Sequence, residues 1–404
     1  MSNILIVSQY FWPEEFRINS IAEELTEKGH TVSVLTGFPN YPSGKFDPDF
    51  LADRKGFSAL GKCKIYRVPV FPRGNGYFSL FLNYVSFFIS ASIIGPLKIK
   101  DLKVDHVLVY QLSPATVLIP GFLISKIKKS SFIPWVQDLW PEAVTATGVK
   151  LWKPMHAAIE NSVNFFFKRS NYVICQSESF VRVLHQRGVL QENLKFIPNW
   201  AEDIYSQTEI EYAPEIIIDD KCFTIMFAGN LGEGQDLPNI LNAIKTTSDY
   251  DINLRWVFVG GGRLLGWLKE EVKKNNLSKQ VLILGRFQIE RMPSFFLHAD
   301  VMLISLKNTS VYEMTIPSKL QSYFIAGKPI LGMLSGEGAE LIKQSSSGYV
   351  APAGDYNGLA EIVKKIANLK EPELMQMGEN SRTFGYENYS KDKLMNELDI
   401  LLRS

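Results

Sequence analysis

Residues 313–329 of this chain read EMTIPSKLQSYFIAGKP, in which a carboxylate precedes the start of a helix. Pro317 suits the first turn of a helix, and the Ser318 hydroxyl can meet the free backbone N–H groups there. These unpaired N–H groups and the positive end of the helix dipole attract anions, and Lys319 lies beside them. The pattern predicts a site that holds a sugar hydroxyl at Glu313 and a diphosphate at the helix start. An ordinary helix N-terminus with an acidic neighbour is the alternative.

The same stretch resembles the E-x7-E region of the family-4 retaining glycosyltransferases. Glu313 matches the first glutamate of that motif, and Gln321 stands in place of the second. In that family the first glutamate contacts the donor sugar and the second contacts the ribose of the nucleotide. An amide can hydrogen-bond a ribose hydroxyl but carries no charge. The resemblance therefore implies donor binding by both residues, with a ribose contact rather than acid–base chemistry at Gln321.

Chain length and the alternation of apolar and amphipathic segments predict the fold. A chain of 404 residues exceeds the usual size of one hydrophobic core. Short apolar runs separated by helical patterns are typical of an α/β fold with parallel strands. We expect strands at residues 4–8, 31–36, 65–69, 106–109, 131–136, 172–175, 223–227, 254–259, 281–284, 301–304 and 330–333. The prediction is two facing Rossmann-like doubly wound domains, the GT-B fold of the resembling family, with a C-terminal helix that crosses back to the first domain.

The expected domain limits follow from an acidic, irregular connector that begins near residue 199. Residues 1–205 are predicted to form an acceptor-binding domain, and residues 206–380 a nucleotide-sugar-binding domain. Residues 381–404 are predicted to form the helix that packs on the first domain.

The first half of the chain offers candidate acceptor contacts at two strand ends. The loop after the first expected strand lacks the glycines of a dinucleotide-binding fingerprint, which argues against an NAD(P) enzyme. That loop leaves Arg17 and Asn19 as acceptor contacts, or as parts of a simple strand-to-helix connection. Gln137 and Asp138 follow the strand at 131–136, at the edge where α/β proteins bind ligands. Asp138 is expected to orient or deprotonate an acceptor hydroxyl, with helix capping as the alternative.

The second half offers a glycine-rich loop after the strand at 223–227. Glycines such as Gly229 let backbone amides approach a phosphate closely. The resembling family places Arg and Lys where this chain has Asn230 and Gln235, so Lys319 is expected to supply the missing charge. Later strand ends add three candidate donor contacts, which are Arg263, Arg286 and Phe287. The last two rest on the resemblance, and an ordinary exposed loop is their alternative.

The stretch at residues 77–97 contains no charged residue and is as long as a membrane span. A span there would divide one sheet between the two sides of a bilayer, so we expect none. Basic residues flank the stretch, with Arg67 and Arg73 before it and Lys98 after it. Interfacial aromatics with a basic rim predict a surface that dips into lipid headgroups, and a helix that covers the first sheet is the alternative. The excess of basic residues in the first 200 positions suits an anionic membrane surface or an anionic ligand.

Composition narrows the cellular setting. Three widely separated cysteines, Cys63, Cys175 and Cys222, and an N-terminus without a signal-peptide pattern predict a cytoplasmic protein. The two D-x-D patterns lie in polar loops without a second set of carboxylates, so we expect no metal site. No cofactor and no nucleic acid partner are expected.

The resemblance extends over almost the whole chain and points to enzymes that build colanic-acid, O-antigen and capsule repeat units. It implies a retaining glycosyltransferase, peripherally attached to the inner membrane. The enzyme would move a sugar from a nucleotide diphosphate to an undecaprenyl-diphosphate-linked saccharide. N-acetylfucosamine is the expected sugar, because the chain looks most like N-acetylfucosaminyltransferases. A sugar-nucleotide epimerase or hydrolase on the same fold and a non-catalytic scaffold are the alternatives.

Overall fold

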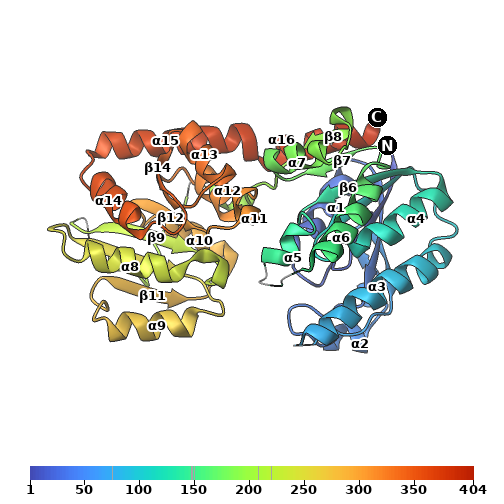
Figure 1. Ribbon diagram of the computed structural model, residues 1–404, viewed down its shortest axis with the longest axis horizontal. Helices are drawn as coiled ribbons and strands as arrows, with labels where there is room; N and C mark the ends of the chain where they lie inside the picture. The colour runs from blue at the N-terminus through green and yellow to red at the C-terminus, as the bar shows by residue number, and fades with distance from the viewer. Residues whose placement is uncertain (75, 147–148, 150, 208, 220) are drawn as a thin grey trace. The chain divides into compact units, whose positions relative to one another are not determined.

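The computed structural model describes residues 1–74, 76–146, 149, 151–207, 209–219 and 221–404. The chain forms two compact units, one made of Met1–Ile197 with Met395–Ser404 and the other of Pro198–Leu394. Each unit is an α/β layer structure in which helices lie on both faces of a sheet (Figure 1). The predicted α/β fold with two Rossmann-like units is confirmed.

The first sheet has the strand order β3-β4-β2-β1-β5-β6-β7-β8. Its strands are β1 (Asn3–Val7), β2 (Thr31–Gly37), β3 (Ala59–Leu60), β4 (Cys63–Val68), β5 (His106–Gln111), β6 (Ser131–Val136), β7 (Val173–Cys175) and β8 (Leu194–Phe196). Neighbouring strands run parallel except β3, which pairs antiparallel with β4. Parallel strands place their carboxyl ends along one edge, so the loops that follow β1, β2, β4, β5 and β6 gather there.

Helices of the first unit lie between these strands in the chain. They are α1 (Arg17–Glu27), α2 (Pro48–Ala52), α3 (Tyr77–Lys98), α4 (Leu118–Lys128), α5 (Glu142–Ala146), α6 (Lys153–Phe167) and α7 (Glu178–Gln186). Helices α3 and α4 pack tightly on one face of the sheet: a Cβ on Gly95 of α3 would lie 2.8 Å from Leu35, and one on Gly121 of α4 would lie 2.2 Å from Val109. Both glycines therefore permit close helix–sheet packing.

The second sheet has the strand order β11-β10-β9-β12-β13-β14, and its neighbouring strands run parallel. Its strands are β9 (Phe223–Ala228), β10 (Leu254–Val259), β11 (Val281–Gly285), β12 (Val301–Ser305), β13 (Ile330–Met333) and β14 (Gly348–Ala351). Its helices are α8 (Leu237–Thr247), α9 (Leu265–Lys274), α10 (Met292–Phe296), α11 (Ser310–Glu313), α12 (Ser318–Ile325), α13 (Glu337–Gln344), α14 (Tyr356–Ala367) and α15 (Glu371–Tyr389).

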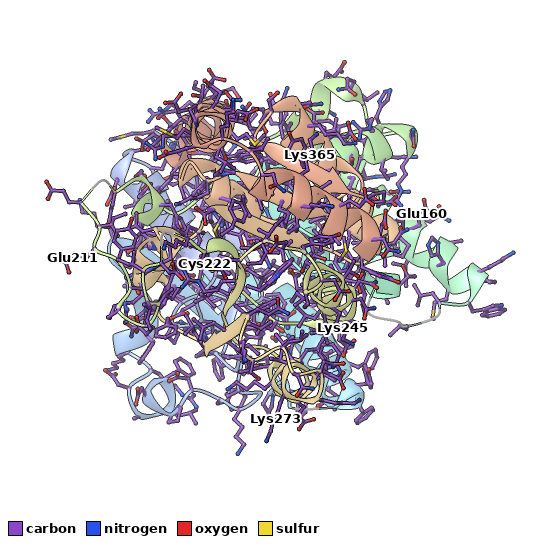
Figure 2. The ribbon with its side chains drawn as sticks, turned by 90° about the vertical axis from the view of Figure 1, so that its left-hand side faces the viewer. Glu160, Glu211, Cys222, Lys245, Lys273 and Lys365 are labelled. Atoms are coloured by element: carbon purple, nitrogen blue, oxygen red, sulfur yellow. The ribbon has the colours of Figure 1, made fainter. Side chains whose placement is uncertain are left out.

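Helices α8, α9 and α14 share one apolar core with the strands of the second sheet. Figure 2 is turned by 90° from Figure 1 and labels Lys245 on α8, Lys273 on α9 and Lys365 on α14. On the opposite face, Tyr323 of α12 reaches the sheet and its hydroxyl donates to the carbonyl of Ala228 at 3.2 Å. The predicted connector after residue 199 packs within this unit, because Arg291 pairs with Glu215 at 2.8 Å.

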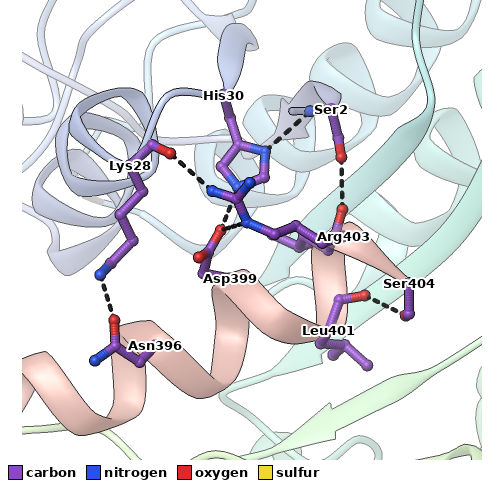
Figure 3. A network of polar contacts seen from close by, with 9 residues as sticks. Ser2, Lys28, His30, Asn396, Asp399, Leu401, Arg403 and Ser404 are labelled. Carbon is purple, nitrogen blue, oxygen red and sulfur yellow. Dashed lines mark hydrogen bonds and ion pairs between the residues drawn. The ribbon is translucent and has the colours of Figure 1, made fainter.

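The end of the chain returns to the first unit, as predicted. Helix α16 (Lys391–Arg403) begins in the second unit and ends in the first. His30 lies 2.6 Å from Asp399, which also accepts from Arg403 at 2.7 Å (Figure 3). The Ser2 hydroxyl donates to the Leu402 carbonyl at 2.7 Å, so the two ends of the chain are joined directly.

Helix α3 is long and apolar enough to cross a membrane by length and composition. It nevertheless covers the first sheet with Phe87 and Ala91, which are fully buried. Its other side is exposed and apolar, with Tyr77 84%, Phe78 73% and Phe81 60% exposed. The alternative of a sheet-covering helix therefore holds for one side of α3, and the lipid contact of its exposed apolar side stays a prediction.

Arg67 does not belong to a basic rim beside α3, which corrects that part of the prediction. The Arg67 side chain is buried and donates to the carbonyls of Gly37 at 3.0 Å, Phe57 at 3.3 Å and Trp12. Three backbone acceptors satisfy the guanidinium, which therefore holds loops of the first unit together.

Candidate functional site

Glycines end three neighbouring strands of the second sheet and bring their loops close together. A Cβ on Gly260, after β10, would lie 1.8 Å from the carbonyl oxygen of Gly229, after β9. The Gly260 N–H in turn donates to the Gly285 carbonyl of β11 at 2.7 Å. No larger residue fits at Gly260. Glycine at this position lets the backbones of the two loops approach each other closely at this edge.

The Gly229 amide is not free for a phosphate, which corrects one expectation. Its N–H donates to the Val259 carbonyl at 2.8 Å, and the Leu231 N–H donates to the Gly261 carbonyl at 2.8 Å. Gly229 instead makes room for a cation, because a Cβ there would lie 3.5 Å from the Nζ of Lys319. Its φ of +130° is also one that residues with a side chain rarely adopt.

Lys319 lies over this loop, from the first turn of α12. Its Nζ donates to the Oε1 of Gln235 at 2.6 Å and lies 3.8 Å from the centre of the Phe227 ring. Desolvation lowers the pKa of Lys319 to about 7. No carboxylate among the described residues pairs with Lys319, so a diphosphate at this position would meet a cation that lacks a counter-charge.

The start of α12 differs in detail from the prediction. Pro317 is the residue before the first helical turn and lies in an extended conformation, and no side chain caps this end. Ser318 is the first helical residue and is exposed, so its hydroxyl is not tied to the helix start. The N-terminal end of the helix therefore has no side-chain cap, and an anion at this end stays a prediction.

Glu313 closes the short helix α11 and is partly exposed. Two glycines allow other loops to approach this helix closely. A Cβ on Gly336 would lie 2.1 Å from the Glu313 carbonyl oxygen, and one on Gly234 would lie 2.3 Å from the Tyr312 hydroxyl. Since Gly234 belongs to the loop after β9, the structure brings Glu313 and the Lys319 loop to the same edge of the second sheet.

Gln321 does not join this surface. Its side chain is fully buried, and neither its amide nitrogen nor its oxygen has a hydrogen-bond partner among the described residues. A ribose cannot reach Gln321 in this arrangement. The eight-residue spacing from Glu313 places Gln321 on α12 but does not reveal that this side of the helix is buried.

Three further donor candidates lie at the same edge and are exposed to different degrees. Arg263 is exposed and pairs with Glu233 at 3.1 Å, next to the glycine-rich loop. Arg286 is exposed and lies 3.4 Å from where a Cβ on Gly261 would be. The Phe287 ring packs on Phe295 at 4.7 Å between centroids.

Asn230 belongs to the glycine-rich loop itself and is exposed. Its amide nitrogen would lie 2.8 Å from a Cβ on Gly232, and its oxygen 2.7 Å from one on Gly262. The amide therefore lies against two glycines of this edge, at the position where the resembling family has a longer basic side chain.

In the first unit, Asp138 lies at the carboxyl edge of the sheet and joins two strand ends. Its Oδ2 accepts from the backbone N–H of Ser113 at 2.8 Å and from the Ser113 hydroxyl at 2.7 Å. The Trp140 indole donates to the same hydroxyl at 3.0 Å. Gln137 is buried, and its carbonyl accepts from Gln176 at 3.2 Å. Asp138 is thus held in place at the edge, whereas Gln137 packs below it.

Asn19 stabilises the loop after β1. Its Oδ1 accepts from the Trp12 N–H at 3.0 Å, and its Nδ2 donates to the Glu14 carbonyl at 2.7 Å. The buried Glu14 carboxylate accepts from the N–H groups of Asn40 and Tyr41, each at 2.7 Å. Burial raises the pKa of Glu14 to about 7, although these hydrogen bonds oppose the shift. The simple-loop alternative therefore accounts for the amide contacts of Asn19.

Arg17 and Asp138 both act on the buried phenol of Tyr110. Burial raises the pKa of Tyr110, the positive charge of Arg17 opposes that rise and the negative charge of Asp138 adds to it. Burial also raises the pKa of Tyr84, which Arg73 lowers and Asp138 raises. Asp138 therefore influences both Tyr110 and Tyr84, and it is bonded to Ser113. Sequence reasoning missed Tyr84 and Ser113, because nothing marks them beyond their positions on α3 and after β5.

The three cysteines are free thiols, and no cluster of metal-ligating side chains exists among the described residues.

Comparisons with known proteins relate the chain to glycosyltransferases. Residues 209–384 match the family model described as "Glycosyl transferases group 1". A protein of Escherichia coli K12 named for colanic acid biosynthesis, the glycosyl transferase WcaI, is 23% identical over 342 residues, which cover 80% of this chain and 81% of that protein. N-acetyl-alpha-D-glucosaminyl L-malate synthase of Bacillus anthracis is 21% identical over 60% of this chain and 62% of that protein.

Solved structures share the fold. Sucrose-phosphate synthase from Thermosynechococcus elongatus superposes with a TM-score of 0.74 at 14% identity, over 100% of this chain and 98% of that chain. HepE of Anabaena, solved with UDP and glucose, gives a TM-score of 0.68 at 13% identity over 100% of both chains. WaaG, a glycosyltransferase involved in lipopolysaccharide biosynthesis, gives 0.64 at 14% identity over 99% of both. The fold is therefore GT-B.

Proposed function

We propose that this chain, whose second unit is a group 1 glycosyl transferase domain, is a retaining glycosyltransferase of bacterial surface polysaccharide assembly. It would move a sugar, with N-acetylfucosamine as the first candidate, from a nucleotide diphosphate to a saccharide linked to undecaprenyl diphosphate. The second unit would bind the donor and the first unit the acceptor.

One observation carries this proposal: Lys319, at the open start of α12, lies against Gly229 and Gln235 of the glycine-rich loop. A partly desolvated cation with no acidic partner among the described residues is suited to a diphosphate. HepE, which shares the fold, was solved with UDP. The relatives that carry sugar-transferring names support the same class of ligand.

The reaction can be written as roles for this chain's own residues. Lys319 and the start of α12 would stabilise the negative charge of the departing diphosphate. Glu313 would accept hydrogen bonds from donor-sugar hydroxyls, since it lies at the same sheet edge. Asn230, Arg263, Arg286 and Phe287 would contact the nucleotide. Retention of configuration needs no protein nucleophile if the acceptor hydroxyl attacks on the side of the leaving group and its proton passes to the departing phosphate.

On the acceptor side, Asp138 would position the acceptor hydroxyl, and Arg17 would add a positive charge nearby. Ser113 and Trp140 hold Asp138 at the sheet edge, as positioning a hydroxyl requires. Gln321 and Gln137 are buried, so they would support the shape of the two sites rather than touch the ligands.

A peripheral position at the inner membrane would bring the enzyme to its lipid-linked acceptor. The exposed side of α3 borders an apolar cleft of about 400 Å³ against α4 and α6. Lys126 lies in the lining of this cleft, and its ammonium lies 5.0 Å from the centre of the Phe122 ring. An apolar surface with cations at its margin fits the boundary between lipid chains and anionic headgroups.

A panel of nucleotide sugars, each incubated with polyprenyl-diphosphate-linked saccharides, tests the proposal directly. The expected result is transfer to a lipid-linked acceptor with the anomeric configuration of the donor retained, as NMR of the product would show. Conversion or hydrolysis of the nucleotide sugar without any acceptor would favour an epimerase or hydrolase. Absence of binding to every nucleoside diphosphate in calorimetry would favour a scaffold.

A further inference from the structure

Arg73 is held in a defined position at the carboxyl edge of the first sheet, in the loop after β4. Its Nη1 donates to the Tyr10 hydroxyl at 2.9 Å, and its guanidinium lies 5.3 Å from the centre of the Tyr41 ring. Its backbone N–H donates to the Asn40 side chain at 2.9 Å. Arg73 therefore has little freedom to move, although it is partly exposed.

A buried amide network fixes the loop that carries Arg73. The Asn83 side chain of α3 donates to the Phe71 carbonyl at 2.6 Å and to the Asn40 side chain at 3.2 Å. The same Asn83 accepts from Gln9 at 2.7 Å. Asn83 and Gln9 are buried, so this network stabilises one conformation of the residues just before Arg73.

The charge of Arg73 is not neutralised within the protein. No carboxylate among the described residues pairs with Arg73, and its bonded neighbours are phenols and an amide. A guanidinium carries five N–H donors and stays charged at any physiological pH. Most of these donors are therefore available to an anion that approaches the sheet edge, where Asp138 also lies.

Exposed aromatic residues flank Arg73 in the chain, on both sides of its loop. Phe71 is 58% exposed, and at the start of α3 Tyr77 is 84%, Phe78 73% and Phe81 60% exposed. A fixed cation next to a row of exposed aromatic side chains matches a ligand in which a phosphate is joined to an apolar chain.

We propose that Arg73 binds the diphosphate of the lipid-linked acceptor, and that Phe78 and Phe81 contact the first isoprene units of its lipid chain. This inference rests on the proposed function, because it assigns the lipid part of the acceptor to the first unit. It adds a recognition site for the carrier, separate from the Lys319 site for the donor diphosphate. A free phosphate and an anionic lipid headgroup share the anionic chemistry, so the test must separate all three ligands.

The test is a set of binding titrations of the full chain with farnesyl diphosphate, farnesol, inorganic diphosphate and UDP. Arg73→Gln removes the charge but keeps an N–H donor for Tyr10. Arg73→Lys keeps the charge but loses the planar, bidentate N–H donors of the guanidinium. We expect Arg73→Gln to weaken farnesyl diphosphate about 10- to 100-fold and Arg73→Lys less, as for loss of a charge-assisted hydrogen bond. Farnesol and UDP should bind as they do to the wild type.

Phe78→Ser tests the lipid contact. It should weaken farnesyl diphosphate several-fold and leave inorganic diphosphate unchanged. Leu190→Ser, another exposed apolar position of the first unit at 60%, is the control and should change neither. Arg54→Gln is the control for Arg73, because Arg54 is an exposed arginine whose guanidinium also lies over an aromatic ring, 5.1 Å from Phe38.

The outcomes separate this inference from the proposed function. Equal weakening of farnesyl diphosphate by Arg73→Gln and Arg54→Gln would overturn the inference, as would unchanged binding in Arg73→Gln. If Arg73→Gln weakens binding to phosphatidylglycerol vesicles as much as binding to farnesyl diphosphate, Arg73 contacts lipid headgroups in general. That result would also overturn the inference. Failure of the wild-type protein to bind UDP or any other nucleoside diphosphate would instead contradict the proposed function. A wild-type melting temperature for each variant shows that the fold is intact.

Discussion

The ammonium of Lys319 lies 2.6 Å from the Oε1 of Gln235, although 84 residues separate the two in the chain. This contact joins the start of α12 to the glycine-rich loop after β9. It defines where a negative charge would be stabilised in the second unit, because Lys319 has no carboxylate partner among the described residues.

Lys319→Met should weaken a nucleoside diphosphate much more than the matching nucleoside. The expected loss is about 1.5–3 kcal/mol, the usual scale for a hydrogen bond to a charged group. Gln235→Ala should cost less, because a neutral amide offers an ordinary hydrogen bond. Calorimetric titration of both ligands measures the difference. If Lys319→Met weakens both ligands equally, the phosphate contact lies elsewhere, and Arg263→Ala is the next variant to measure.

Nucleoside diphosphate binding should take up a proton at mildly alkaline pH. Desolvation lowers the pKa of Lys319 to about 7, so at pH 8 most of the free protein carries a neutral Lys319. A bound diphosphate favours the charged form and raises this pKa, and the protein must then bind a proton. Affinity should therefore be highest below about pH 7 and fall as the pH rises above it. Titrations at pH 8 in buffers of different ionisation enthalpy report the uptake, which should vanish in Lys319→Met.

Glu313→Ala should nearly abolish sugar transfer while the fold stays intact. The loss of a charge-assisted hydrogen bond to the donor costs about 1.5–3 kcal/mol of transition-state stabilisation, or more if the bond positions the reacting carbon. The ratio kcat/KM measures it. Glu340→Ala, in the same unit, is the control because Glu340 pairs only with Lys343 at 2.9 Å among the described residues. Wild-type turnover in Glu313→Ala would remove Glu313 from the site.

Anionic vesicles should bind the chain without inserting it, through the exposed side of α3. Ile93 and Leu97 are 63% and 67% exposed, and Ile93 lines the cleft against α4. Replacing both with Ser should weaken vesicle binding about tenfold, since burial of each such side chain contributes on the order of 1 kcal/mol or more. High salt should release the wild-type protein by screening its basic residues. Sedimentation with vesicles measures both effects. If the protein stays in solution at low salt, the prediction that the exposed side of α3 binds lipid is wrong.

Glu14→Ala should destabilise the first unit by about 3 kcal/mol. The change would leave the N–H groups of Phe11, Asn40 and Tyr41 without their acceptor in a buried position. Glu15→Ala is the matched control, because Glu15 is exposed and next in sequence. Urea unfolding of both variants gives the difference, and equal stability would show that water replaces the carboxylate.

The strands that could be predicted are those with continuous apolar runs. β6 and β10 match the expected limits because buried parallel strands leave long apolar segments in the sequence. Strands β3, β8 and β14 were not predicted, since they are short edge or near-edge strands, and β3 has only two residues. A helix separates β8 and β14 from the strands they pair with, whereas β3 pairs with the next strand but is too short to leave a pattern.

The sequence predicts which helices and strands carry the candidate site residues. It does not predict whether an individual side chain is exposed or buried. Glu313 and Lys319 lie at helix ends and Asp138 follows a strand, and a sequence pattern can identify such positions. The burial of Gln321 and the internal bonds of Arg67 depend on which side of an element faces the core, and a single polar residue does not reveal that. The position of Arg73 likewise depends on contacts with Tyr10 and Asn40, which precede it by tens of residues.

The return of the chain to the first unit makes the second unit an insertion within the first. Leu398 and Leu402 of the final turns are fully buried, so residues 1–197 alone lack part of their own core. The separate first unit should therefore be produced as residues 1–197 joined by a short linker to residues 395–404, with the intervening segment removed as one piece. The chain passes between the units twice, at residues 197–198 and 394–395. Proteolytic cleavage at one of these junctions therefore leaves the two units covalently joined through the other.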